Sequence, residues 1–333
     1  GVLGAAGCGP DLLRKWIAET RSLTDKPFGV DTLLPASVRR MKSSGPRSPS
    51  PADQLPEMIQ FAKDFMEEEG LEAPELPAPS GGGRSRGSGG MFSKDFFEAQ
   101  METVIEEEVP VYAAGLGDPG PWIDRLHKNG TVVMSVVGAV RHAKRVLESG
   151  VDVVVAQGHD AGGHNSPIGT MALVPQVVDA CGDVPVLAAG GIGDGRGIAA
   201  AMMLGAAGVW VGTAFLATEE ANILDFQKKE LVERNEEGTV ISRSVTGKPA
   251  RLLRTKWTQA WVDAGKEPLP MPFQSAVSGP VLAAGAAAQR GDINAGFAGQ
   301  GMGLIQEVRP AAEVMRDLVE GAEAALRRAG NHV

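Results

Sequence analysis

The sequence is poor in cysteine and tyrosine, and it lacks long apolar runs. It has one tyrosine and two cysteines, Cys8 and Cys181, so a disulfide framework is excluded and a reducing, cytoplasmic location is expected. No apolar stretch approaches the ~20 residues that a bilayer span requires, and no secretory signal is recognised. We therefore expect no membrane association.

Positive charge and metal-binding patterns are also scarce. The formal net charge is −9 and the pI is about 5.2, which argues against a nucleic-acid partner because no basic face is available. There is no CxxC pair, no HxxxH helix motif and no GxSxG elbow. We therefore expect no metal site and no serine hydrolase.

The chain does contain a series of short, nearly continuous apolar runs. Such runs are typical of parallel strands that are covered on both faces, and the later ones are spaced to leave room for one helix each. They predict an α/β fold of the (β/α)₈ TIM-barrel type, with the first strand missing from this numbering because the chain opens on a strand-and-turn pattern. The runs span residues 1–6, 26–34, 109–117, 131–138, 151–158, 184–191 and 208–215.

Two regions interrupt the barrel pattern. Residues 40–105 include proline-rich stretches and the tract GGGRSRGSGG, a composition that predicts a flexible insertion, either as a lid or as a plain loop. A short helix is expected within it at 55–66. Residues 221–304 predict a small, mostly helical cap domain over the active site. The barrel would then comprise residues 1–220 and 305–333.

Glycine turns follow the last two predicted strands. In AAGGIGDGRG, at 188–197, glycines let the backbone approach an anion, and the helix that follows would direct its N–H groups toward it. A second turn lies at Gly212–Thr213. Because barrels commonly bind phosphate in these two loops, the pattern predicts an FMN site, with tight turns as the alternative.

His164 is the strongest candidate for a catalytic residue. It follows two glycines after the strand at 151–158, and an imidazole can exchange a proton near pH ~6.5. His159 lies in the same loop and is the competing choice.

These motifs, taken in order, resemble the nitronate monooxygenase family, formerly called 2-nitropropane dioxygenase, which also includes the FMN-dependent enoyl-ACP reductases. The motifs are AQGHDAGGHN, PIGTMALVPQVVDA, AAGGIGDGRGIAAAMMLGAAGV, VGTAFLATEEA and AGQGMGLI. The resemblance implies an FMN-binding barrel with a small helical domain over the site, and it implies that His164 is the catalytic histidine. The implied cofactor-binding residues are Asp31, Gln157, Gly162, Gly163, Gly190, Gly191, Gly212 and Thr213.

The chain departs from the family pattern at two positions near the expected flavin. Asp31 stands where the family usually has asparagine, and this exchange changes which hydrogen bonds can reach the flavin. Ser166 stands where the family usually has glycine, two residues after the histidine.

The resemblance implies an enzyme that oxidises alkyl nitronates with O₂ to a carbonyl compound and nitrite, using FMN and a small-molecule substrate. One alternative is NAD(P)H-dependent reduction of an enoyl thioester on the same flavin. Another is a flavin-binding barrel with little turnover. A homodimer is compatible with the sequence, which does not determine the oligomeric state.

Overall fold

A curled sheet of seven parallel strands forms the larger part of the molecule, in the order β1-β2-β3-β4-β5-β7-β8. The computed structural model describes residues 1–34, 50–72 and 94–331. Each strand lies within one of the predicted apolar runs, which confirms the α/β barrel class. β1 and β8 form the two edges, so the described strands make an open half-barrel. The bounds are Val2–Gly4, Gly29–Leu33, Val111–Leu116, Val132–Val137, Val153–Gln157, Val186–Ala189 and Gly208–Trp210.

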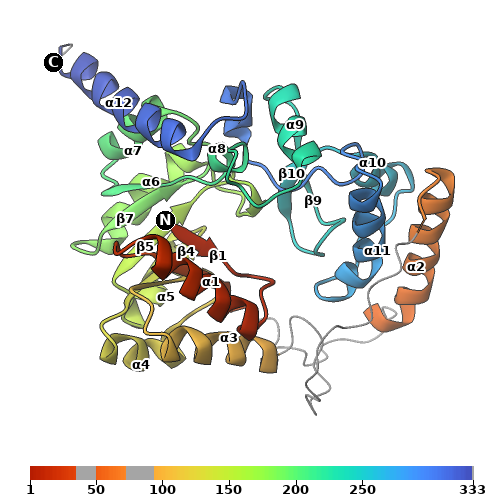
Figure 1. The fold of residues 1–333 in the computed structure, drawn as a ribbon, viewed down its shortest axis with the longest axis horizontal. Coiled ribbons are helices and arrows are strands. Elements are labelled where there is room, and N and C mark those ends of the chain that lie inside the picture. The colour runs from red at the N-terminus through yellow and green to blue at the C-terminus, as the bar shows by residue number, and fades with distance from the viewer. Residues whose placement is uncertain (35–49, 73–93, 332–333) are drawn as a thin grey trace.

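Helices that alternate with these strands cover the outer face of the sheet (Figure 1). The core between sheet and helices consists mainly of valine, alanine, leucine and isoleucine side chains. The last helix, α12, packs on α7, where a Cβ at Gly195 would lie 2.2 Å from the backbone nitrogen of Ala322. The helices are α1 Pro10–Leu23, α3 Lys94–Glu106, α4 Ile123–Lys128, α5 Val140–Glu148, α6 Thr170–Cys181, α7 Gly195–Met203 and α12 Ala311–Gly330.

Helix α3 is tied to the start of the chain. The buried Gln100 side chain donates to the carbonyl oxygens of Ala5 and Cys8 at 2.8 and 2.7 Å. Arg14 of α1 pairs with Glu107, just beyond α3, at 3.1 Å. Helix α3 therefore packs against the barrel, although its residues 94–105 fall in the segment 40–105 that was expected to be an insertion.

A second, smaller layer follows the barrel and contains a sheet that the sequence analysis did not predict. Its strands β9 and β10 pair antiparallel, and β10 also pairs with β6, a two-residue strand from the loop after β5. No helix among the described residues is long and apolar enough to cross a membrane. The elements are β6 Gly163–His164, α8 Thr213–Leu216, α9 Asp225–Glu233, β9 Thr239–Ser242, β10 Ala250–Leu253, α10 Lys256–Asp263 and α11 Phe273–Ala287.

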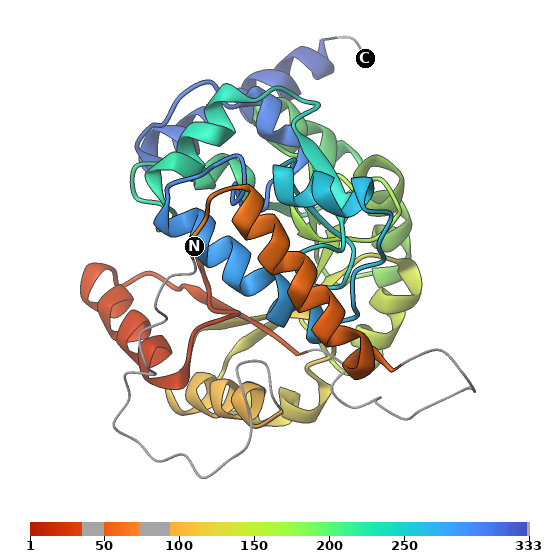
Figure 2. The same ribbon diagram turned by 90° about the vertical axis from the view of Figure 1, so that its right-hand side faces the viewer.

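Helix α2, Pro51–Glu68, runs alongside α11 in this layer (Figure 2). Its aromatic side chains pack against two tryptophans of α10. Phe65 meets Trp257 edge to face at 5.0 Å between ring centroids, and Phe61 meets Trp261 at the same distance. Trp257 is completely buried. We refer to α2, α10 and α11 together as the cap helices, and the expected helix at 55–66 lies within α2.

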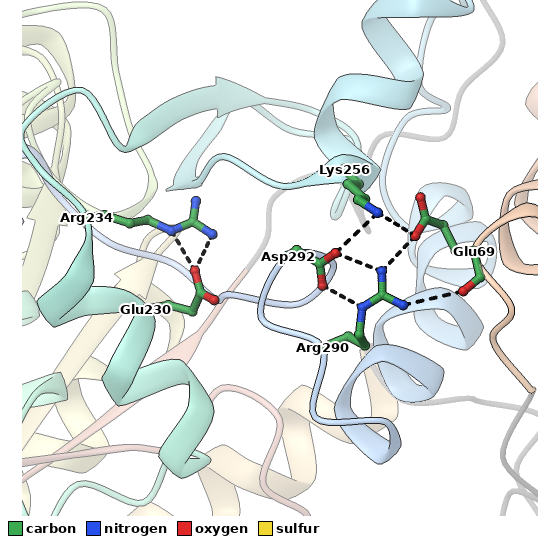
Figure 3. Close-up of polar contacts among 6 residues, drawn as sticks. All are labelled: Glu69, Glu230, Arg234, Lys256, Arg290 and Asp292. Atoms are coloured by element: carbon green, nitrogen blue, oxygen red, sulfur yellow. Dashed lines mark hydrogen bonds and ion pairs between the residues drawn. The ribbon is translucent and has the colours of Figure 1, made fainter.

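Four charged side chains join the end of α2 to the other two cap helices (Figure 3). Glu69 accepts from Lys256 at 2.8 Å and from Arg290 at 2.7 Å. Asp292 bonds the same Arg290 at 2.7 Å. Because each cation is shared between two carboxylates, the contact is a network rather than a set of isolated pairs.

Candidate functional site

The candidate active site lies where the carboxyl ends of β3, β4 and β5 meet β6. After Gln157 the chain makes a glycine-rich loop and returns as β6, in which His164 pairs with Ala250 of β10. The Gln157 side chain donates to the carbonyl oxygen of His164 at 2.6 Å. His164 is thus held between the barrel and the small sheet.

The loop before His164 depends on glycine. Gly163 has a φ of +74°, a backbone conformation that residues other than glycine rarely adopt. A Cβ at Gly162 would lie 2.8 Å from the backbone of Ala298 and of Gly299, so the two loops touch there without side chains between them. The motifs AGGH and AGQG, far apart in sequence, therefore form one backbone contact.

The environment of His164 favours its neutral form. Its Nε2 lies 2.9 Å from the hydroxyl of Thr246. Burial lowers the pKa of the imidazole, and the nearby Lys248 ammonium lowers that pKa further. An imidazole that is neutral at pH 7 can accept a proton from a substrate.

The competing histidine, His159, is engaged in structural contacts. Its Nδ1 lies 2.9 Å from the carbonyl oxygen of Ser166, and its own carbonyl oxygen accepts from Arg251 at 3.1 and 3.2 Å. His159 does not line either of the two cavities described next.

Two cavities meet at Gln157, which lines both. The histidine cavity has a volume of about 320 Å³ and is lined by His164, Lys248 and the strand ends at Gly115 and Gly138, among others. The glycine cavity has a volume of about 250 Å³. It is lined by all of the expected cofactor residues except Asp31, namely Gln157, Gly162, Gly163, Gly190, Gly191, Gly212 and Thr213.

The glycines in AAGGIGDGRG serve different purposes. Gly190 and Gly191, at the end of β7, have φ values of +104° and +73° and line the glycine cavity. Gly195 instead allows α12 to approach α7. Asp194 caps α7 by accepting from the N–H groups of residues 196 and 197, so the prediction that this helix offers free N–H groups to an anion is wrong for those two.

The second glycine turn connects to the late loop. The Thr213 hydroxyl accepts from the backbone N–H of Gly299 at 2.9 Å, and its hydrogen is left to donate to another group. A Cβ at Gly212 would meet nothing within 4 Å, so this turn faces open space.

Asp31 lies in β2 beside the histidine cavity but does not line it. The missing side chain of Gly115 makes room for its carboxyl group, since a Cβ there would lie 2.5 Å from Oδ1. This Oδ1 is buried and has no hydrogen-bond partner among the described residues. Burial raises the pKa of Asp31 to about 7, so the group carries a proton much of the time at neutral pH. A protonated carboxyl can both donate and accept, as asparagine does.

Ser166, the other departure, is accommodated by Gly138 at the end of β4. A Cβ at Gly138 would lie 2.6 Å from the Cβ of Ser166. The extra side chain therefore occupies space that the glycine leaves free, and both residues line the histidine cavity.

The residues present fit a phosphorylated flavin. The Asp31 oxygen lacks a partner, the turn at Gly190–Gly191 exposes backbone without side chains, and the two cavities join at Gln157. The described residues contain no group of three or more potential metal-ligating side chains.

Two residues near His164 were missed by the sequence analysis. Thr246 and Lys248 lie in TGKPA, about 80 residues after His164, and reach it only because β10 pairs with β6. The motif contains a glycine, Gly247, but it follows no apolar run of the kind that predicted the barrel strands, so the sequence did not mark it as part of the site.

Residues 1–321 match the family model described as nitronate monooxygenase. The chain belongs to the nitronate monooxygenase family. Its members, and the flavoprotein structures that resemble it, support an FMN-dependent oxidoreductase.

Two relatives are similar to this chain over different shares of their own length. A Mycobacterium tuberculosis protein provisionally named a monooxygenase is 40% identical over 96% of this chain and 87% of its own. A 5-hydroxy-7a-methyl-1-oxo-octahydro-1H-indene-4-carboxyl-CoA dehydrogenase of Rhodococcus jostii is 44% identical over 77% of this chain and 56% of its own.

Solved structures agree with this assignment. A nitroalkane oxidase from Streptomyces ansochromogenes superposes with a TM-score of 0.80 and 29% identity, covering 99% of this chain and 89% of that one. FabK from Thermotoga maritima superposes with a TM-score of 0.73 and 30% identity, covering 100% and 88%.

Proposed function

We propose that this chain oxidises alkyl nitronates with O₂ to a carbonyl compound and nitrite, with His164 as the catalytic residue. The observation that carries the proposal is the half-buried imidazole of His164 in the histidine cavity, which shares Gln157 with the glycine cavity and its turn at Gly190–Gly191. The likeness to a nitroalkane oxidase supports the same reaction class.

In this proposal the chain's residues divide between holding the cofactor and handling the substrate. FMN, when bound, supplies the redox chemistry. Gly190, Gly191, Gly212 and Thr213 would hold its phosphate through backbone and hydroxyl donors. Gln157, Gly162 and Gly163 would contact the ring, and Asp31 would offer it a hydrogen bond.

His164 would orient a nitronate or take a proton from a neutral nitroalkane. The Thr246 hydroxyl is 3.4 Å from the carbonyl oxygen of Lys248 and can donate to it, which lets Thr246 accept from Nε2–H of His164. No described group bonds Nδ1, so in this tautomer Nδ1 carries the free lone pair. Thr246 therefore acts as a positioning residue that selects the basic nitrogen.

A second candidate function is oxidation or reduction of an acyl thioester. It is favoured by the 44% identity to the Rhodococcus carboxyl-CoA dehydrogenase and by the likeness to FabK. The removal of a proton beside an activated carbonyl would use the same histidine. An NAD(P)H-dependent enoyl reduction would need a hydride from the nicotinamide instead.

An anaerobic mixing experiment separates these reactions. Purified flavin-loaded protein is mixed with an alkyl nitronate, with NADH or with a saturated acyl-CoA, and loss of the yellow absorbance is recorded. Bleaching by nitronate alone is expected. Bleaching only by NADH would replace the proposal with enoyl reduction, and bleaching only by the thioester would replace it with dehydrogenation.

The role of His164 is tested by His164→Asn beside the matched control His159→Asn. With a neutral nitroalkane as substrate, the first should lower turnover by about 10²- to 10⁴-fold with flavin still bound, because proton transfer is lost. The His159→Asn variant should turn over substrate at close to the wild-type rate, because the asparagine amide nitrogen can replace Nδ1 of His159 in the hydrogen bond to the carbonyl oxygen of Ser166. Equal kinetics in both variants would eliminate the catalytic role of His164.

A further inference from the structure

The histidine cavity has an unbalanced set of charges. Arg145 and Lys248 line it as cations beside two histidines of lowered pKa, His142 and His164, and Asp118 is the one acidic side chain among the described residues that line it. Asp118 is already engaged, since its Oδ1 accepts from the N–H of Gly120 at 2.9 Å. The lining of this cavity therefore favours a negatively charged ligand over a neutral one.

Lys248 is the cation closest to the proposed chemistry. It lies in the turn before β10, and its backbone N–H donates to the Thr246 hydroxyl that contacts His164. The side chain is half-buried, and no described carboxylate pairs with its ammonium group. Desolvation lowers the pKa of Lys248, as expected for a cation partly removed from water without a counter-ion.

An ammonium group that is desolvated and unpaired is costly in the free protein. An anion that enters the cavity would offset that cost by supplying the missing counter-charge. The turn from Thr246 to β10 fixes the lysine backbone beside the imidazole, so a bound anion would lie within reach of both side chains.

We propose that Lys248 forms an oxyanion subsite, which binds the charged oxygens of the substrate while His164 contacts the adjacent carbon. The ligand class is a small planar oxyanion. That this anion is a nitronate rests on the function proposed above, whereas the subsite itself follows from the cavity and its charges.

The first test compares an anionic and a neutral form of one substrate. In flavin-loaded protein, Lys248→Met should raise the KM for an alkyl nitronate by about 10- to 100-fold, because a charge-assisted contact is lost. The KM for the corresponding neutral nitroalkane should change less than about 3-fold. Lys248→Arg should restore most of the nitronate affinity. Lys144→Met, on the exposed side of α5, is the control and should match wild type.

A second measurement needs neither flavin nor turnover. In apoprotein, NMR titration should show that Lys248→Met raises the pKa of His164, since a neighbouring positive charge is removed. Among the charged side chains that line the cavity, Asp118, His142 and Arg145 remain in this variant and act as the constant background. Nitrate, a planar oxyanion, should shift the His164 resonances in wild type and not in Lys248→Met.

The two measurements distinguish the subsite from the proposed function. If nitrate responds to Lys248 but nitronate is not oxidised by wild type, the subsite stands and the nitronate assignment fails. If Lys248→Met leaves both the nitrate response and the pKa of His164 unchanged, the subsite is overturned. Equal losses for nitronate and neutral nitroalkane would also overturn it, because they would indicate a general structural role.

Discussion

The barrel and the cap helices differ in the side chains that form their cores and in how far apart those side chains lie in the sequence. The barrel core is made of small and β-branched side chains that come from neighbouring βα units. The core of the cap helices contains an aromatic cluster that joins Phe61 and Phe65 of α2 to Trp257 and Trp261 of α10, about 190 residues away. The barrel thus depends on a local repeat, whereas the cap depends on long-range contacts.

The difference shows how the active site is assembled. The barrel supplies Gln157 and the glycine turns at strand ends, where local sequence determines the backbone. The segment between the barrel and the cap helices supplies Thr246 and Lys248 through the pairing of β10 with β6. The chemistry proposed for His164 would therefore need the barrel and the small sheet to be in register.

Among variants that test the difference between the barrel and the cap helices, Trp257→Ala should have the largest effect on stability. Removal of a completely buried tryptophan should cost about 3–5 kcal/mol of unfolding free energy, concentrated in the cap helices. Hydrogen exchange should then show loss of protection in α2 and α11 while β5 stays protected. Leu13→Ala in α1 is the matched barrel variant and should affect β5 instead. Equal loss of protection in β5 and α2 would show that the two cores unfold as one unit.

A smaller effect, confined to the barrel, is expected from Asp31→Asn in the apoprotein. The folded pKa of about 7 lies above the ordinary value of 3.8, so the contribution of Asp31 to stability is present below pH ~4 and is lost as the pH rises through 7. Because asparagine does not titrate, the variant lacks this dependence of stability on pH. At pH 8 the variant should be more stable by about 2–4 kcal/mol, and the difference should shrink toward pH 4. Denaturant unfolding at each pH from 4 to 8 measures the difference in unfolding free energy between the two proteins. A difference that stays constant with pH would contradict a raised pKa of Asp31.

The smallest effect is expected from Glu69→Gln, which weakens the network of Figure 3. The Glu69 side chain is 20% exposed and faces two cations, so its loss should cost about 1 kcal/mol, and less at high salt. Hydrogen exchange at the end of α2 reports this change. Lys229→Gln, which breaks the exposed pair with Glu233, is the control and should leave α2 unaffected. A loss of protection that does not depend on salt would mean that packing, and not charge, stabilises this end of α2.

The sequence predicted the barrel strands and their glycine turns because these features are local. Seven apolar runs of strand length, each followed by a turn, leave few other arrangements once the crossovers must be short. The sequence did not show that Gly195 and Gly190 have different roles. Both belong to one glycine run, and only the packing of α12 shows which of them faces a helix.

The sequence by itself determined the parallel sheet, the position of His164 after β5 and the family to which these motifs belong, because strand periodicity and glycine turns act over a few residues. Only the tertiary structure decided that α2 packs with α10 and α11, that Thr246 and Lys248 face His164, and that Asp31 is buried against Gly115. Each of these contacts joins segments far apart in the chain, and no local pattern encodes which distant side chain will fill a given space.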